Sequence, residues 1–228
     1  MDAHRDKPLR LALIGMSGAG KSFWTKHLAK VGYSTVSCDD RIEAGLAPVL
    51  QAGNFEGING VASWMGWPDR ETYAERESRY LQEEISVLDG VLDGLEKNPA
   101  TELILDTTGS VIYCGNHLLH RLRKQMTVLY LEASAAEREL LVRRYLEDPK
   151  PVLWRGAFQA KSGEKPNDTV LRCYPMLVEA RRRSYEALAH CTVPVSELRP
   201  LSAEAEHAGV APGLKFLERV RGQLAARA

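Results

Sequence analysis

A short apolar run that ends in a glycine-rich turn constrains this 228-residue chain more than any other feature of its sequence. Residues 9–14 read LRLALI, and residues 15–22 directly after them read GMSGAGKS. The second stretch matches the pattern G-x-x-x-x-G-K-[ST] at every specified position, and this pattern indicates a phosphate-binding loop where a strand precedes it and a helix follows it. The apolar run predicts that strand, and the helix-like apolar spacing over residues 21–30 predicts that helix.

The residue types in this loop explain how it would hold a phosphate. Glycine lets the backbone turn so that several N–H groups point at one anion, and the helix that follows adds the positive end of its dipole. We expect Lys21 to reach the β- and γ-phosphates of a nucleotide and to act in catalysis, and Ser22 to bind Mg²⁺. The alternative is a glycine-rich turn that binds nothing. The predicted nucleotide-binding residues of the loop are Gly15, Ser17, Gly18, Ala19, Gly20, Lys21, Ser22 and Phe23.

Composition and charge exclude several classes of protein. Lysine plus arginine equals aspartate plus glutamate, 30 against 30, which argues against a general binder of nucleic acid or of anionic membranes. The 4 cysteines form no CxxC pair, so we expect reduced thiols and no zinc site. No apolar run approaches the ~20 residues that a membrane-spanning helix needs, and the first residues lack the apolar stretch of a secretory signal. We therefore expect a cytoplasmic protein.

Apolar segments alternate with helical patterns along the chain. This alternation indicates parallel βαβ units, and all-apolar stretches such as LALI and LIL indicate strands buried on both faces. The sequence therefore predicts an α/β chain with a three-layer P-loop fold and a five-stranded parallel sheet, as a single domain over residues 1–228. The expected strands cover 9–14, 32–40, 102–106, 126–132 and 191–195, and the main expected helices cover 21–30, 69–97, 135–145, 168–190 and 213–226.

Two segments interrupt the alternation. Residues 44–68 combine glycines with Phe55, Trp64 and Trp67, which predicts short helical pieces in a flap over the acceptor. The two tryptophans either form a wall of the acceptor pocket or pack the flap onto the core. Residues 147–168 carry prolines, glycines and cations and are interpreted as a surface excursion that serves as a lid.

Cations on the lid, and on the helix that enters it, would neutralise phosphate charge during transfer. Most of these side chains are expected to be solvated, and one or two to touch the nucleotide. Arg143, Arg144 and Lys150 are favoured over the others, and Arg143 and Lys150 are the predicted nucleotide-binding residues.

Aspartates follow two of the predicted strands. Asp106 ends the third strand, where a carboxylate holds Mg²⁺ or its water in P-loop proteins. Asp39 ends the second strand, which is expected to neighbour the P-loop strand, so its carboxylate would face the γ-phosphate and accept a proton from an attacking hydroxyl. Either aspartate could instead cap a turn. Asp40 is predicted to be the N-cap of the next helix, with Glu43 completing a capping box.

Residues 11–43, LALIGMSGAGKSFWTKHLAKVGYSTVSCDDRIE, resemble the opening of the shikimate kinase family, from the P-loop to a D-x-D-x-x-I-E element. The resemblance implies ATP-dependent phosphoryl transfer to a hydroxyl, with Mg²⁺, and binding of the acceptor by Asp39. TTGS at 107–110 is similar to the family's glycine-rich acceptor turn, which implies an acceptor contact at Gly109. Lys150 stands where the lid cation near ATP is usual, and Arg181 in RRRSY where an arginine meets the acceptor's anionic group.

The chain departs from the family at three places. Ser37 replaces the first aspartate of D-x-D, which implies that the metal contact has moved to Asp106. The glycine triplet of the acceptor turn is reduced to Gly109. The F-R-x-x-E acceptor clamp aligns with Tyr73 and Ala74, which leaves Arg70 or Arg76 as substitutes for its arginine.

The leading hypothesis is an ATP-dependent kinase of a small hydroxylated metabolite. Shikimate is the nearest named acceptor, and a nucleoside, a nucleotide or a sugar acid is its rival. Two other classes stay open: a P-loop nucleotide-binding regulatory protein without transfer activity, and a slow ATP or GTP hydrolase. The expected partner is the small-molecule acceptor, with no nucleic acid and no membrane, in a monomer or weak homo-oligomer.

Overall fold

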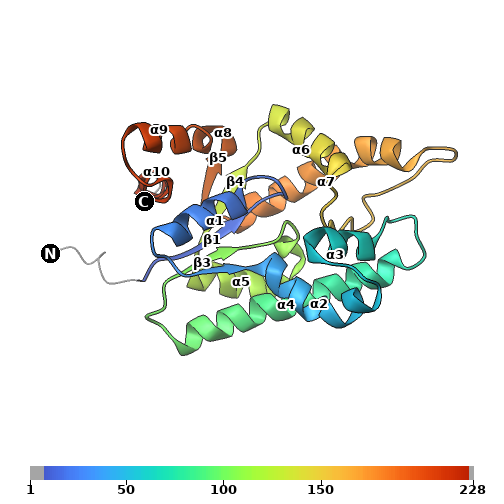
Figure 1. Ribbon diagram of the computed structural model, residues 1–228, viewed down its shortest axis with the longest axis horizontal. Coiled ribbons are helices and arrows are strands. Elements are labelled where there is room, and N and C mark those ends of the chain that lie inside the picture. The colour runs from blue at the N-terminus through green and yellow to red at the C-terminus, as the bar shows by residue number, and fades with distance from the viewer. Residues whose placement is uncertain (1–7, 226–228) are drawn as a thin grey trace.

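Five parallel strands form one sheet in the order β2-β3-β1-β4-β5, in a computed structural model that describes residues 8–225 (Figure 1). The predicted α/β fold with a five-stranded parallel sheet is confirmed. The expected place of the second strand is wrong, because β3 lies between it and the P-loop strand. The strands are β1 Arg10–Ile14, β2 Thr35–Ser37, β3 Leu103–Asp106, β4 Thr127–Glu132 and β5 Cys191–Pro194.

Helices cover both faces of the sheet (Figure 1). Alternate side chains of β1 explain the three layers: Ala12 and Ile14 join the core beneath α2, α4 and α7, while Leu11 and Leu13 join the core beneath α1 and α10. The helices are α1 Lys21–Lys30, α2 Cys38–Ala52, α3 Gly57–Met65, α4 Tyr73–Lys97, α5 Asn116–Gln125, α6 Ala135–Glu147, α7 Pro166–Leu188, α8 Val195–Leu198, α9 Leu201–His207 and α10 Pro212–Ala225, with a 3₁₀ turn at Val111–Tyr113.

The second strand ends earlier than predicted. β2 stops at Ser37, whose side-chain oxygen accepts the N–H of Asp40 at 3.2 Å, so Ser37 is the N-cap of α2. Asp39 and Asp40 lie in the first turn of this helix, where the helix dipole favours carboxylates. The predicted N-cap at Asp40 is therefore wrong. Glu43 does not close a capping box, and instead accepts the N–H of Gly57 at 2.9 Å.

The lid segment is partly core. No helix or strand covers residues 148–165, yet Val152, Leu153 and Trp154 are all buried. Their backbone is held by α4: the N–H of Trp154 donates to the Tyr73 hydroxyl at 3.1 Å, and that hydroxyl lies 2.8 Å from the carbonyl of Val152. The prediction of a surface excursion is wrong for these three residues, because their apolar side chains join the core cluster that α4 and α7 also form.

The last helix closes the other face. Phe216 of α10 stacks on Trp24 of α1 with ring centroids 4.8 Å apart, so α10 packs on the chain's own core. The predicted helix over 213–226 is present as far as Ala225, and residue 226 lies outside the described residues. None of the described helices combines the length and apolarity needed to cross a membrane.

Candidate functional site

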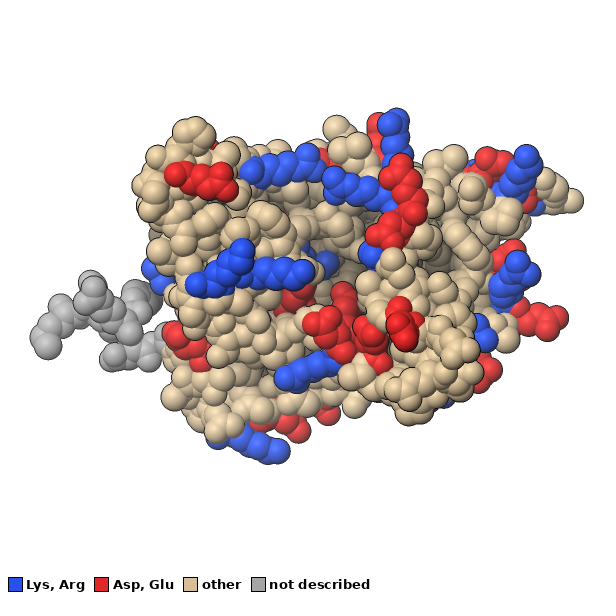
Figure 2. Space-filling model, viewed as in Figure 1, with Lys and Arg blue, Asp and Glu red and all other residues tan. Residues whose placement is uncertain are grey.

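A cleft of about 570 Å³ lies at the carboxyl ends of β1, β2 and β3. Ligands of open parallel sheets bind at this edge, because loops and helix N-termini meet there. Figure 2 shows this face hollowed near its middle, with basic and acidic side chains on both sides. The lining residues come from the loop before α1, from α1, β2 and α2, from α3 and α4, from the turn after β3 and from the start of the lid: Ser17, Gly18, Lys21, Ser22, Thr25, Lys26, Ala29, Thr35, Ser37, Asp39, Asp40, Ile58, Tyr80, Asp106, Thr108, Gly109, Lys150 and Pro151.

The loop between β1 and α1 requires its glycines. Gly15, Gly18 and Gly20 have φ values of 140°, 80° and 95°, which residues with a side chain rarely adopt. A Cβ atom would lie 2.8 Å from the carbonyl oxygen of Leu131 at Gly15, and 2.9 Å from a Leu141 methyl at Gly18. The backbone therefore closes tightly around the start of α1, as a phosphate-binding loop does.

Lys21 is the buried cation of the cleft. Its Nζ donates to the carbonyls of Gly15 and Met16 at 2.9 and 3.1 Å. Burial lowers the pKa of Lys21, and the nearby carboxylates of Asp106 and Asp39 oppose this shift. The ammonium group is thus fixed at the loop, close enough to both aspartates for their charges to act on it.

Asp106 supplies an oxygen that lacks a protein partner. It is 4% exposed at the end of β3, and its Oδ1 has no hydrogen-bond partner among residues 8–225. Burial raises its pKa, while Lys21 and a hydrogen bond from Ser22 lower it. The hydroxyl of Thr25 in the same cleft is also buried and unpartnered within the described chain. Orphaned oxygens of this kind fit a hard cation.

These residues fit Mg²⁺ that arrives with a nucleotide. Within residues 8–225, no three His, Cys, Asp or Glu side chains gather into a metal-binding cluster. A metal beside Ser22 and Asp106 would therefore take most of its ligands from phosphate and water, which is the usual coordination of Mg²⁺.

Asp39 faces the same cleft from the first turn of α2. Burial raises its pKa to about 6, with Lys21 opposing the shift. The hydroxyl of buried Tyr80 on α4 donates to Asp39 Oδ1 at 3.3 Å. Asp39 therefore has the geometry and the pKa of a group that can accept a proton near neutral pH. Tyr80 was not among the site residues predicted from the sequence, because a tyrosine within a helical apolar pattern indicates core packing.

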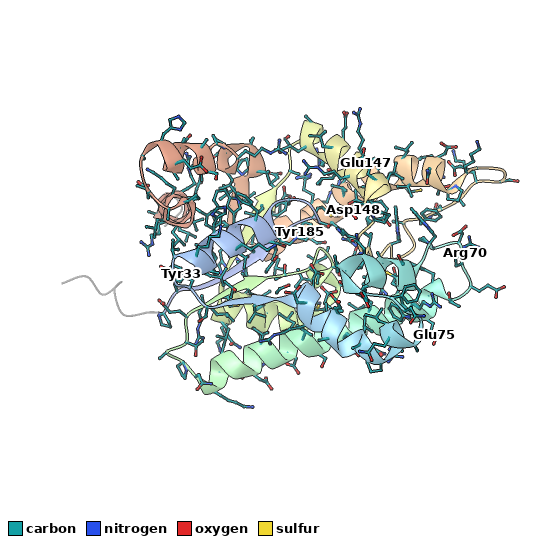
Figure 3. All side chains as sticks on the ribbon, viewed as in Figure 1. Tyr33, Arg70, Glu75, Glu147, Asp148 and Tyr185 are labelled. Atoms are coloured by element: carbon teal, nitrogen blue, oxygen red, sulfur yellow. The ribbon has the colours of Figure 1, made fainter. Side chains whose placement is uncertain are left out.

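The turn after β3 brings Gly109 to the cleft, but Arg181 lies behind it. Arg181 is 2% exposed and does not line the cleft. Its guanidinium donates to the carbonyls of Gly109 and Leu153 at 2.9 and 2.6 Å and lies over the Tyr113 ring at 5.2 Å. The hydroxyl of Tyr185, a residue labelled in Figure 3, donates to the same Gly109 carbonyl. In this conformation Arg181 therefore binds backbone carbonyls of the turn and of the lid.

Glu84 is a buried carboxyl group that our sequence analysis also missed. Its two oxygens accept the hydroxyls of Thr108 and Ser110 in the turn after β3. Burial raises the pKa of Glu84 to about 7, while these two hydrogen bonds lower it. The only signal in the sequence was a glutamate at helical spacing from the apolar residues of α4, and Glu77 on the same buried face gives that signal as well.

The three favoured cations of the lid, and of the helix that enters it, have different surroundings in the structure. Arg143 and Arg144 are both exposed. Arg144 lines a cavity of about 210 Å³ beside Ser17 and Gly18, whereas Arg143 lines neither that cavity nor the main cleft. Lys150 lines both that cavity and the main cleft. Its Nζ lies 2.5 Å from Asn59 Oδ1 on α3 and 2.7 Å from Asp148 Oδ2, and Asp148 is marked in Figure 3.

Other predicted residues lie away from the cleft. Phe23 is 47% exposed, with its ring 4.5 Å from that of His27. Ala19 is buried in the core beneath the loop. Arg70 is exposed at the outer end of the molecule (Figure 3), and Arg76 donates to the Trp64 carbonyl.

The two tryptophans of the flap have different surroundings. Trp64 is buried in the core, whereas Trp67 lines a cavity of about 180 Å³ together with Tyr145 and Lys150. This cavity shares Lys150 and Pro151 with the main cleft. Trp64 therefore packs the flap onto the core. For Trp67, a place in the wall of the acceptor pocket stays a prediction.

The chain is similar to shikimate kinases in sequence and in fold. No protein-family model matches the chain. The curated shikimate kinase of Paracidovorax citrulli (strain AAC00-1) is 32% identical over 134 residues, which cover 58% of this chain and 61% of that protein. The match therefore spans about three fifths of the length of that relative.

Two crystal structures share the fold. The shikimate kinase from Acinetobacter baumannii in complex with shikimate superposes with a TM-score of 0.54 at 22% identity, covering 86% of this chain and 94% of that one. The shikimate kinase from Bacteroides thetaiotaomicron gives 0.52 at 18% identity, covering 82% and 86%. The predicted resemblance to the shikimate kinase family is thus confirmed in sequence and in fold.

Proposed function

We propose that this protein is an ATP-dependent small-molecule kinase that transfers the γ-phosphoryl group to a hydroxyl of its acceptor. The observation that carries the proposal is the meeting of Lys21, Asp39 and Asp106 in one cleft, from three separate segments of the chain. A phosphate loop by itself would serve binding. A phosphate loop opposite a carboxyl group that can take a proton serves transfer.

On the donor side, the backbone N–H groups of residues 15–22 surround the β-phosphate, and the Lys21 ammonium balances charge on the transferred group. Ser22 and Asp106 would hold Mg²⁺. Bound Mg²⁺ would neutralise negative charge on the β- and γ-phosphates. Lys150 approaches from the lid, where its bonds to Asn59 and Asp148 join lid and flap beside the cleft.

On the acceptor side, the hydroxyl oxygen attacks the γ-phosphorus. A bond forms between these two atoms, the bond from phosphorus to the oxygen that bridges the β- and γ-phosphates breaks, and ADP leaves with that oxygen. Asp39 accepts the hydroxyl proton, and Tyr80 holds the carboxyl group by its hydrogen bond. Balanced, ATP and an alcohol give ADP, a phosphate ester and a proton.

Shikimate is the first acceptor to test, because the chain resembles shikimate kinases and one of the similar structures holds shikimate. Nucleosides and sugar acids are the other acceptors proposed. Gly109 is the proposed acceptor contact. Arg181 would meet an acceptor anion only after its bond to the Leu153 carbonyl breaks.

That bond also favours a second candidate, a nucleotide-binding protein without transfer activity. In this structure the Arg181 guanidinium donates to backbone carbonyls and does not line the cleft, so an anionic acceptor in the cleft does not meet it. Such a protein would bind ADP and Mg²⁺ and would be stabilised by them in a thermal-shift assay, yet it would turn over no acceptor.

The test measures ADP formation by the purified chain with ATP and Mg²⁺, against a panel of shikimate, a nucleoside and a sugar acid. Acceptor-dependent turnover with one of these compounds is expected. Binding of nucleotide with no turnover of any compound would favour the second candidate. Hydrolysis of ATP or GTP at the same rate with and without acceptors would instead indicate a hydrolase.

A further inference from the structure

Glu84 forms a closed ring of hydrogen bonds with the turn after β3. Its Oε1 accepts the hydroxyl of Thr108, and its Oε2 accepts the hydroxyl of Ser110 at 2.6 Å. Thr108 Oγ1 also accepts the backbone N–H of Ser110 at 3.0 Å, and the two hydroxyl oxygens lie 3.1 Å apart. Both carboxyl oxygens of Glu84 therefore have partners, although the residue is only 2% exposed.

The same turn is fixed on its other sides. The Gly109 carbonyl accepts bonds from Arg181 and Tyr185 of α7. A Cβ atom at Gly109 would lie 3.4 Å from the backbone nitrogen of Ser17 in the phosphate loop. The turn is thus enclosed by the loop, by α7 and by Glu84 of α4, so a shift of the turn would move the floor of the cleft relative to the nucleotide.

Only part of this assembly reaches the cleft. Thr108 and Gly109 line it, whereas Ser110 and Glu84 are buried behind them. Glu84 therefore does not line the cleft itself, and its two hydrogen bonds reach a bound acceptor through the turn.

We propose that Glu84 is a positioning residue for the acceptor: its two hydrogen bonds hold the turn at 107–110 so that Thr108 and Gly109 meet the acceptor in one orientation. This inference rests on the proposed kinase function. A buried carboxyl group is costly, and an apolar residue would fill the same space at lower cost. Satisfied polar networks fix one arrangement of the groups that they join, which is what an acceptor-facing turn requires.

The test compares Glu84→Gln, Ser110→Ala and the double variant with the wild-type chain, using shikimate as the first probe and the other panel compounds after it. An amide offers one acceptor oxygen where the carboxylate offers two, so one hydroxyl loses its partner. We expect the acceptor KM to rise about tenfold in each single variant, while the KM for ATP stays within about twofold. Because both changes free the same turn, the double variant should be no worse than about twofold beyond the singles.

Glu75→Gln is the matched control. Glu75 lies on the same helix, is exposed and lies at the edge of the molecule in Figure 3, so this variant should behave as the wild type. Ser110→Ala keeps the measurement useful if Glu84→Gln fails to fold, because it removes one small hydroxyl only.

Several outcomes of this test would overturn the inference about Glu84. Unchanged acceptor KM in both single variants, or a lower melting temperature with no change in KM, would show that Glu84 serves stability alone and would overturn the inference. Effects that multiply in the double variant would also contradict it. No acceptor-dependent turnover by the wild-type chain would instead contradict the proposed function itself, and the inference with it.

Discussion

The proposed donor side and the proposed acceptor side of the cleft are built in different ways. The donor side is one continuous stretch, residues 15–22, and its shape follows from glycines with positive φ at the end of a buried strand. The acceptor side is assembled from α2, α4, the turn after β3, α7 and the lid, through hydrogen bonds such as those of Glu84 and Arg181. The first side is formed by residues that are adjacent in sequence. The second side forms only when distant segments of the chain fold together.

The two sides are expected to respond differently to mutation. Under the proposed function, a change in the phosphate loop would act directly on a bound nucleotide, because the loop's own atoms would make the contacts. A change on the acceptor side propagates through bonded neighbours, as with Arg181, which touches both the Gly109 turn and the lid backbone. Four measurements test this contrast, in order of decreasing expected effect.

The largest effect is expected from Lys21→Met. Removing the buried ammonium takes away the charge that faces the transferred phosphate, so kcat should fall about a thousandfold. The control is Lys30→Met, an exposed lysine on the same helix, which should leave kcat unchanged. The measurement is acceptor-dependent ADP formation. Near-normal turnover in Lys21→Met would mean that the loop only binds nucleotide.

Asp39→Asn should lower kcat about a hundredfold, because an amide cannot take the proton of the acceptor hydroxyl. Binding of ADP with Mg²⁺, measured by calorimetry, should stay unchanged. Asp40→Asn makes the same chemical change one residue further along α2 and should cost less than about threefold. Equal losses in the two variants would refute the role assigned to Asp39.

Asp106→Asn should raise the Mg²⁺ concentration for half-maximal rate about tenfold, since a neutral amide is a weaker partner for the ion or its water. The unpartnered oxygen of Asp106 at the end of β3 motivates this expectation. The measurement is a Mg²⁺ titration at saturating ATP and acceptor. An unchanged midpoint would place the metal contact elsewhere.

The pH dependence should show the smallest effect. The raised pKa of Asp39, about 6, means that the carboxyl group gains its proton as pH falls through that value and can then no longer accept one. For a single group of this pKa, kcat/KM for the acceptor should fall about fourfold between pH 7 and about pH 5.5. Rates in Asp39→Asn should lack this step. A flat wild-type profile over the same window would exclude Asp39 as the proton acceptor.

Much of the fold could be read from local patterns. The apolar runs LALI and LIL indicated buried parallel strands, and the structure has them as β1 and β3. The glycine-rich loop between β1 and α1 was predicted from the sequence, because glycine positions and the start of a helix depend on neighbours in sequence. Its binding of a phosphate stays a prediction. The strand order was not predicted correctly, because local patterns do not state which strands pair.

The acceptor side was predicted only in part. Asp39 and Gly109 line the cleft, yet Arg181 lies buried behind it, on the carbonyls of Gly109 and Leu153. Tyr80 and Glu84 were missed, since their partners lie 41 and 24 residues away in the chain. A sequence pattern does not show which distant groups a buried polar side chain will meet.

The sequence by itself therefore determined the glycine-rich loop after β1 and the alternating strands and helices, and it supplied the charged groups for which roles are proposed. The tertiary structure alone decided the order of the strands, the burial of Val152, Leu153 and Trp154, and the bonds that fix the turn at 107–110. The physical reason is the separation along the chain of the residues that set each property. Backbone conformation follows from adjacent residues, whereas burial and hydrogen bonding of polar groups follow from what the whole chain brings beside them.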